Sequence, residues 1–309
     1  MDCQSDFAHR DALFQLRLKD QTCSISQTGN GVGMKKIRCF FRHALLGALG
    51  LCWIAEAAPK IERDIFYPNI SEEQADTFRV ERCRLDVYVP EGNAGNLPVV
   101  IWFHGGGMRN GNKYFPKGLQ REGVIIVAAN YRLFPKVKCP VYIQDAAAAV
   151  AWTFENIGQY GGDPEKIFLS GFSAGGYLTA MVGIDPRWLA AHGIQTTELA
   201  GIAPMSGMMS THFTVREERG DTSKVPVLDE FAPIRHCTAD APPVLLFTGD
   251  RDKDWPGRME ENQLMAKTLK IVGHSDVTIY ELKGLGHNGE QEKAACPIFL
   301  EWIQQHVGE

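Results

Sequence analysis

A serine flanked by glycines is the first feature of the chain that could do chemistry. Gly171, Ser173 and Gly175 form a G-x-S-x-G pattern directly after the apolar run Ile167–Leu169 and before a stretch with helical spacing. A serine at such a strand-to-helix turn is held in a strained conformation with its hydroxyl exposed, and the glycines let strand and helix pass closely. The position of the pattern therefore predicts that Ser173 is a nucleophile.

A run of glycines follows another apolar run. His104–Gly107 reads His-Gly-Gly-Gly and directly succeeds Val99–Phe103. Glycines leave backbone N–H groups unobstructed, so we expect the N–H groups of Gly106, Gly107 and Ala174 to form an oxyanion hole. We interpret His104 as a residue that shapes this loop rather than as a catalytic base.

A nucleophilic serine needs a histidine as its base. His287 ends the sequence Gly284–His287, directly after a strand-like stretch. The carboxyl ends of strands are where ligands bind in open α/β sheets. The other candidates are placed less well, because His274 lies in a polar turn and His306 in the last helical stretch. The sequence therefore predicts His287 as the base.

Three aspartates are candidates for the acid that orients the base. Asp250, Asp252 and Asp254 follow the apolar run Val244–Phe247. The chain order serine, aspartate, histidine is a known order of a catalytic triad. Asp250 and Asp254 also have plain interpretations as solvated loop or helix-capping residues. Spacing alone leaves the choice of aspartate open.

The elements that must position these residues alternate along the chain. Continuous apolar runs, typical of strands buried on both faces, occur at 99–103, 124–128, 167–169 and 244–247. Helical stretches occur at 145–156, after Ser173, and at 258–272 and 291–306. Alternation of the two predicts a mostly parallel sheet with helices on both faces. We further expect antiparallel strands within 79–89, an edge strand at 277–282 and a polar excursion at 207–239 over the C-terminal edge of the sheet.

Together these motifs resemble the α/β-hydrolase-fold serine esterases of the HGGG type, the group of hormone-sensitive-lipase-like carboxylesterases and acetyl- and feruloyl-esterase-like hydrolases. The matching motifs run from about Arg79 to the C-terminus: LDVYVP at 85–90, HGGG at 104–107, NYRL at 130–133, GGDPEKIFLSGFSAGG at 161–176, GDRD at 249–252 and GLGH at 284–287. The resemblance implies the α/β-hydrolase fold. It also implies Asp252, the fourth residue of the G-x-x-D loop, as the triad acid and His287 as the base.

The chain departs from the family pattern in three places. Residues 58–79 leave little room for the helical N-terminal cap of hormone-sensitive-lipase-like members, which implies a more open site that resembles the polysaccharide-ester branch. Met108 follows HGGG where that branch often has an aromatic residue. The loop after Asp252 continues with Lys-Asp-Trp-Pro and is more polar than usual.

We therefore expect hydrolysis of a carboxylic ester by Ser173, His287 and Asp252, with no metal and no organic cofactor. The expected substrate is a small-molecule or polysaccharide ester, with acetyl or feruloyl groups on polysaccharides as candidates. Trp255 and the excursion 207–239 are expected to contact its acyl or leaving group. An amidase, formamidase or serine peptidase would use the same residues, and a catalytically silent binding protein would share the fold, so both alternatives stay open.

The composition excludes several other classes of protein. The 309 residues are 44% hydrophobic and 22% charged, as in a globular chain rather than a disordered or polytopic membrane protein. A formal net charge of −5 provides no basic field for nucleic acid. After residue 57 the chain keeps four cysteines, which are either two disulfides or four free thiols: Cys83, Cys139, Cys237 and Cys296.

The first 57 residues differ from the rest of the chain. From Met34, a stretch with Lys35, Lys36, Arg38 and Arg42 precedes twelve uncharged residues, 44–55. This is the layout of a secretory signal peptide over 34–57, with cleavage after Ala57, and the apolar run is too short for stable membrane insertion. We expect residues 1–33 to be an upstream extension of the reading frame, 58–309 to be the catalytic domain, and the protein to be secreted or periplasmic.

N-terminal sequencing of the exported protein tests this division. We expect the mature chain to begin at Ala58, because small residues occupy the two specificity positions before that bond, Ala55 and Ala57. A mature chain that still carries residues 2–33 would contradict the prediction.

Overall fold

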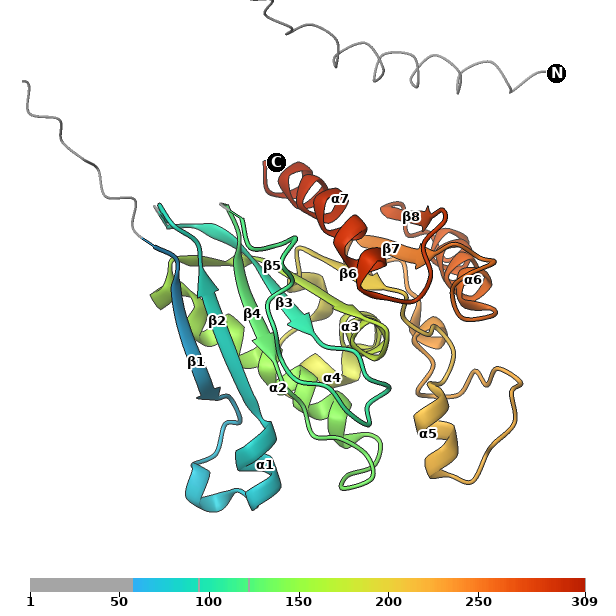
Figure 1. Ribbon diagram of the computed structural model, residues 1–309, viewed down its shortest axis with the longest axis horizontal. Coiled ribbons are helices and arrows are strands. Elements are labelled where there is room, and N and C mark those ends of the chain that lie inside the picture. The colour runs from blue at the N-terminus through green and yellow to red at the C-terminus, as the bar shows by residue number, and fades with distance from the viewer. Residues whose placement is uncertain (1–57, 94, 122, 309) are drawn as a thin grey trace, which may run out of the picture. The chain divides into compact units, whose positions relative to one another are not determined.

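Eight strands form a single sheet in the part of the chain that the computed structural model describes, residues 58–93, 95–121 and 123–308 (Figure 1). The described residues belong to one compact unit. The predicted leader, with its divisions at 1–33 and 34–57, lies outside them and stays a prediction. The strands are β1 (Lys60–Phe66), β2 (Arg84–Val89), β3 (Leu97–Phe103), β4 (Ile125–Ala129), β5 (Gly162–Phe172), β6 (Gly201–Met205), β7 (Val244–Gly249) and β8 (Val277–Leu282).

The sheet is mostly parallel, which confirms the predicted α/β-hydrolase fold class. Its order is β1-β2-β4-β3-β5-β6-β7-β8. Strand β2 pairs antiparallel with β1 and with β4, and every later pair is parallel. Strand β8 is an edge strand, as expected from its alternating polarity. Because β3, β5, β6, β7 and β8 run in the same direction, the residues that follow them meet at one edge of the sheet.

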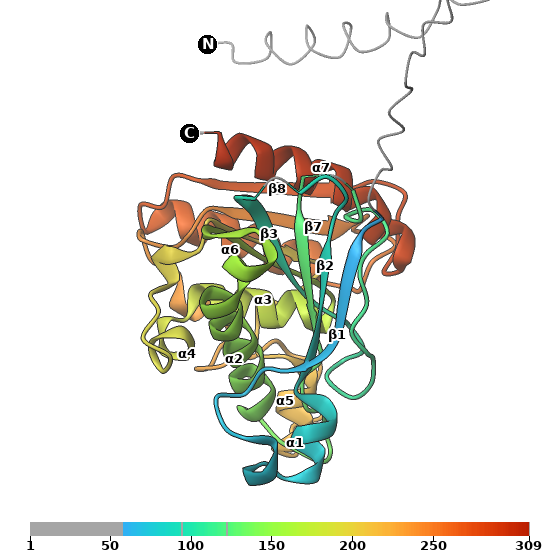
Figure 2. The ribbon, with the colours of Figure 1, turned by 90° about the vertical axis from the view of Figure 1, so that its left-hand side faces the viewer.

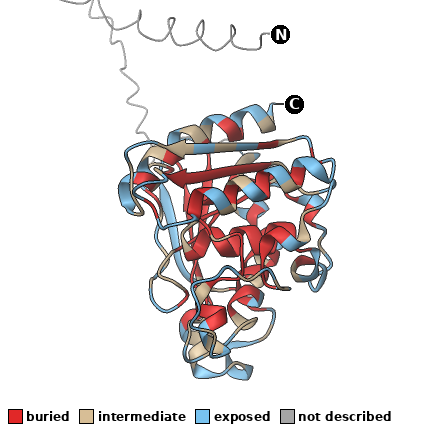
Figure 3. Cartoon of the chain, turned by 90° about the vertical axis from the view of Figure 1, so that its right-hand side faces the viewer, coloured by how far each residue is buried: buried red, intermediate tan, exposed pale blue. Residues whose placement is uncertain are grey.

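Seven α-helices accompany the sheet in the described residues, and their packing creates two cores (Figure 2). Val99, Ile101 and Phe103 of β3 belong to the core under α2, α3 and α6, whereas Val100 and Trp102 belong to the core under α7. The alternation follows from the period of two along a strand. Figure 3 shows the buried strands between partly exposed helices. The helices are α1 (Thr77–Arg82), α2 (Val141–Asn156), α3 (Ala174–Ile184), α4 (Pro186–Ala190), α5 (Phe213–Glu218), α6 (Arg258–Ile271) and α7 (Gly289–Val307).

One local expectation is wrong, and β1 lies where the sequence pattern predicted no strand. Residues 77–82 form helix α1 rather than the start of a strand, because Asp76 caps the helix by accepting a hydrogen bond from the backbone of Arg79. The sequence also gave no sign of β6. This strand has only five residues and contains Gly201 and Pro204, two residue types that weaken a strand pattern.

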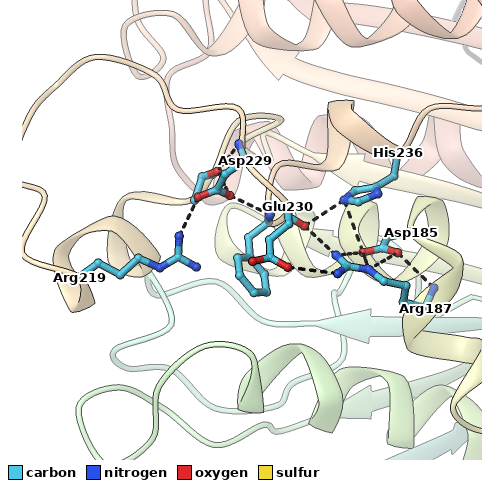
Figure 4. A network of polar contacts seen from close by, with 8 residues as sticks. Asp185, Arg187, Arg219, Asp229, Glu230 and His236 are labelled. Carbon is cyan, nitrogen blue, oxygen red and sulfur yellow. Dashed lines mark hydrogen bonds and ion pairs between the residues drawn. The ribbon is translucent and has the colours of Figure 1, made fainter.

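The segment 207–239 connects β6 to β7 and carries α5 as well as a short 3-10 helix, Pro233–His236. A polar network holds it against the start of α4 (Figure 4). Arg187 contacts the buried carboxylate of Asp185 at 2.8 Å and that of Glu230 at 3.3 Å. His236 Nε2 donates to the carbonyl of Glu230 at 2.9 Å and lies 3.5 Å from the Asp185 carboxylate. Ionic contacts to a buried carboxylate are stronger than exposed ones, so this network fixes the part of the segment 207–239 that carries Glu230 and His236.

The four cysteines of the described residues are free thiols, which decides between the two alternatives left open by the sequence. Cys83 and Cys296 are buried, and burial raises the pKa of each thiol to about 12. A thiol with so high a pKa is inert as a nucleophile. Across the described ranges, no helix combines the length and the hydropathy needed to cross a bilayer.

Candidate active site

Ser173 lies at a sharp turn between β5 and α3. Its backbone angles are φ 59° and ψ −114°, which a residue with a side chain rarely adopts. The N–H of Ser173 donates to the carbonyl of Met205 on the neighbouring strand β6 at 2.8 Å, which holds the turn in place. The hydroxyl makes no capping bond to α3. It is therefore free to contact other side chains, as the sequence predicted for a nucleophile turn.

The two glycines around Ser173 are required by close backbone packing. A Cβ on Gly171 would lie 2.6 Å from the carbonyl oxygen of Phe103, and a Cβ on Gly175 would overlap that same oxygen. Real Cβ atoms do not approach so closely. The turn therefore brings Ser173 directly beside the end of β3, where the His104–Gly107 loop begins.

His287 contacts Ser173 with one ring nitrogen and an aspartate with the other. Its Nε2 lies 2.8 Å from Ser173 Oγ, and its Nδ1 lies 2.8 Å from Asp254 Oδ1. The rings of Phe172 and Trp255 lie beside the imidazole, at centroid distances of 4.9 and 6.1 Å. The arrangement has the geometry of a nucleophile, a base and an orienting acid.

The acid that the structure places against His287 is Asp254 and not Asp252, so the choice implied by the resemblance is wrong. The backbone N–H of Asp254 donates to the carbonyl of Asp250 at 2.8 Å, an i to i+4 bond that winds the loop into one helical turn. At about 100° per residue, positions 252 and 254 lie about 200° apart on this turn, so the side chain of Asp254 points inward and that of Asp252 points away. Asp252 is exposed, and its N–H donates to the carboxylate of Asp250.

Asp254 is buried and accepts hydrogen bonds from several directions. Its Oδ2 accepts from Ser206 Oγ at 2.6 Å and from the N–H of Gly249 at 2.8 Å, and Oδ1 accepts from the N–H of Trp255. Burial alone would raise the pKa of this carboxyl, but these hydrogen bonds and that with His287 outweigh burial and hold its pKa well below the ordinary value. Asp254 is therefore an anion at neutral pH.

Ser206 is a site residue that the sequence did not indicate. Besides its bond to Asp254, its Oγ lies 3.1 Å from His287 Nδ1, and its backbone adopts a left-handed φ of 49°. It directly follows β6, a strand that the sequence pattern did not predict. Had Gly201–Met205 been identified as a strand, Ser206 would have fallen at the same sheet edge as the other polar site residues.

The glycine loop after β3 packs against the serine turn, as expected. A Cβ on Gly105 would lie 3.4 Å from the Cβ of Ser173. Gly106 and Gly107 have φ angles of 106° and 62°, and the next residue, Met108, is fully buried with a φ of 58°. The residue after HGGG therefore fills the core and does not line an acyl site.

His104 is buried and holds the loop. Its Nδ1 donates to the carbonyl of Gly105 at 2.7 Å, its ring stacks on Tyr131 at 4.4 Å, and Arg82 lies 3.4 Å from Nε2. Burial, helped by the positive charge of Arg82, lowers the pKa of His104 to about 4, although the bond to Gly105 acts in the opposite direction. A neutral imidazole enclosed in this way fits the interpretation of His104 as a loop-shaping residue.

A cavity of about 820 Å³ lies next to the loop that carries Trp255. We call it the side cavity; it lies between the excursion and the start of α6, and Phe213, Arg216, Trp255, Arg258 and Leu264 are among its lining residues. Phe213 lies 3.3 Å from a Cβ built on Gly107, and Trp255 contacts His287. The side cavity therefore borders the site on the side of Gly107 and His287. Both sequence regions expected to contact substrate, Trp255 and 207–239, line it.

Among the residues that the structure describes, no group of three His, Cys, Asp or Glu side chains is placed so that it could hold a metal ion.

Comparison with curated proteins identifies esterases as relatives. The chain is 29% identical to the probable carboxylic ester hydrolase LipM of Mycobacterium tuberculosis, over 69% of this chain and 57% of that protein. It is 27% identical to the isoprenylcysteine alpha-carbonyl methylesterase ICME of Arabidopsis thaliana, over 82% of this chain and 64% of that one. The chain spans about half the length of the first curated relatives that it matches.

Solved structures show the same fold. A truncated carbohydrate esterase from gut microbiota superimposes with a TM-score of 0.65 at 18% identity, over 81% of this chain and 97% of that one. Residues 85–193 match the BD-FAE family, and residues 141–309, more than half of the chain, match the prolyl oligopeptidase family. The chain therefore belongs to the prolyl oligopeptidase family, within the α/β-hydrolases that its motifs resemble.

Proposed function

We propose that the chain hydrolyses carboxylic esters through an acyl-enzyme formed on Ser173. The observation that carries the proposal is the continuous hydrogen-bonded line from Ser173 Oγ through His287 to Asp254. His287 Nε2 takes the proton of Ser173 as Oγ attacks the ester carbonyl, and it then gives that proton to the leaving alkoxide. A water molecule, deprotonated by the same nitrogen, releases the acid and restores Ser173. Asp254 holds the tautomer and stabilises the imidazolium.

We propose that the N–H groups of Gly106, Gly107 and Ala174 stabilise the tetrahedral oxyanion. In a trans peptide the C=O and the N–H point in opposite directions, so fixing the carbonyl also aims the following N–H. His104 fixes the carbonyl of Gly105, which supports the orientation of the Gly106 N–H. The backbone of Arg109 and Asn110 binds the carbonyl of Gly106, which does the same for the Gly107 N–H. Ala174 is the first residue of α3, whose opening N–H groups lack partners within the helix.

The proposed substrates are esters of short acids or of feruloyl-type acids, including those carried by polysaccharides. The names of the structural and curated relatives, which include a carbohydrate esterase and methylesterases, support an ester as the scissile group. Amide or peptide hydrolysis is the second candidate, and the match of 141–309 to the prolyl oligopeptidase family favours it. We also propose that the enzyme is secreted or periplasmic, on the evidence of the signal-like segment 34–57.

Hydrolysis of 4-nitrophenyl acetate and of 4-nitroacetanilide tests the proposal, because the two share an acyl group and differ in the scissile bond. We expect the ester to be turned over and Ser173→Ala to lower kcat by at least about a thousandfold, since the nucleophile is lost while the oxyanion donors remain. Circular dichroism checks that the variant is folded. Retention of most of the activity in Ser173→Ala, or a higher kcat/KM for the anilide, would contradict ester hydrolysis by this serine.

Replacing each aspartate in turn distinguishes Asp254 from Asp252. Asp254→Asn keeps the shape of the side chain but removes the charge that orients His287, so we expect kcat to fall by about a hundredfold to ten-thousandfold. Asp252→Asn is the matched control on the same loop, and we expect it to change kcat by less than about twofold because the side chain is exposed. The opposite ranking of the two variants would overturn the assignment of Asp254.

A further inference from the structure

Arg258 is a buried cation without a partner. It is the first residue of α6, is 7% exposed, and lines the side cavity. Its Nε and Nη1 atoms are buried and meet no hydrogen-bond acceptor in the described ranges. A buried guanidinium normally has its donors satisfied, because an unpaired buried charge is costly. The described residues therefore leave these donors of Arg258 without an acceptor.

The nearest carboxylates are occupied elsewhere. Asp254 and Glu261 are close enough to raise the pKa of Arg258 against the lowering effect of burial, but within the described residues neither forms an ion pair with it. Glu261 accepts from the backbone of Met209 and from both the N–H and the hydroxyl of Ser210. Asp254 is bound by His287 and Ser206. Both carboxylates therefore have other hydrogen-bond partners, and neither accepts a hydrogen bond from Arg258.

Other charges around the cavity balance one another more closely. Arg216 donates to the carbonyls of Ser223 and Val225, and Arg109 pairs with Glu217. Burial, together with Arg258, Arg216 and Arg109, lowers the pKa of His212, so this neighbour stays neutral. Glu260 and Lys224 also line the cavity at its exposed side. Arg216 Nε also lacks an acceptor, but Nη1 of Arg216 is bonded to the chain, whereas the guanidinium of Arg258 has no hydrogen-bond partner among the described residues.

The cavity walls define what kind of ligand would fit. Met208, Phe213 and Leu264 give the cavity an apolar lining, and its volume of about 820 Å³ accommodates an organic molecule rather than a simple ion. A carboxylate matches the planar fork of one guanidinium. A doubly charged phosphate is a poorer fit, because the carboxylates of Glu217, Glu260 and Glu261 line the same cavity.

We propose that Arg258 binds a carboxylate carried by the substrate, so that the preferred substrates are anionic esters whose charged group lies in the side cavity. The proposal rests on the proposed ester hydrolysis at Ser173 and names its substrate class. The cavity adjoins that site through Phe213, beside Gly107, and Trp255, beside His287. One molecule can therefore present its ester to Ser173 and its carboxylate to Arg258.

Two matched substrate pairs test the proposal and locate the carboxylate. The 4-nitrophenyl monoester of glutaric acid against 4-nitrophenyl valerate places the charge in the acyl group, and 4-acetoxybenzoate against 4-acetoxybenzamide places it in the leaving group. We expect the wild type to prefer the anionic member of at least one pair by about tenfold or more in kcat/KM. Arg258→Met should abolish that preference, mainly by raising KM for the anion, and Arg258→Lys should keep part of it.

The control is Lys267→Met, which removes an exposed cation from the same helix. We expect it to leave the preference within about twofold, because exposed charges are screened. Arg258→Lys serves as the test if Arg258→Met does not fold. An anionic preference that is absent from both pairs, that survives in Arg258→Met, or that is undiminished in Arg258→Lys, would overturn the proposal while the hydrolysis of the neutral esters still stands. Failure of the wild type to hydrolyse any of the four esters would instead overturn the proposed function, and this inference with it.

Discussion

The hydrogen bond between His287 and Asp254 is the contact around which the rest of the site is arranged. It joins the loop after β7 to the loop after β8, and through His287 Nε2 it reaches the serine at the end of β5. Ser206, at the end of β6, binds the second oxygen of the same carboxylate. Four neighbouring strand ends therefore converge on one buried anion. Because the surroundings have a low dielectric, these charge-assisted bonds are strong, and the anion in turn fixes the imidazole.

A second constraint acts on the backbone rather than on side chains. The glycines of the serine turn let α3 and β5 approach the end of β3, so that Ser173 lies next to the His104–Gly107 loop. The peptide planes of that loop are fixed through their carbonyls, by His104 on one side and by Arg109 and Asn110 on the other. His104 does this as a neutral ring, because burial lowers its pKa, and the Nδ1 proton is the one that it donates. The proposed catalysis thus depends on donors that are oriented before substrate binds.

Much of this arrangement follows from the sequence, because strand ends and glycine turns leave local patterns. Ser173 and the glycine loop each follow an apolar run, and His287 follows a stretch of alternating polarity, and the structure contains all three as strands. The role of Asp254 could not be predicted in this way. A single helical turn after β7 decides which of three nearby aspartates points inward, and spacing in the sequence does not fix that turn. The roles of Ser206 and Arg258 could not be predicted from the sequence for a related reason. The role of each is defined only by contacts between elements that are distant in the sequence.

Proton NMR of the histidine ring tests the central contact directly. A ring N–H shared with a buried carboxylate gives a strongly downfield-shifted signal, which His287→Gln assigns by removing it. We predict this signal in the wild type and in Asp252→Asn, and its loss or large upfield movement in Asp254→Asn. A signal that disappears in Asp252→Asn and persists in Asp254→Asn would contradict the account of how this site is built.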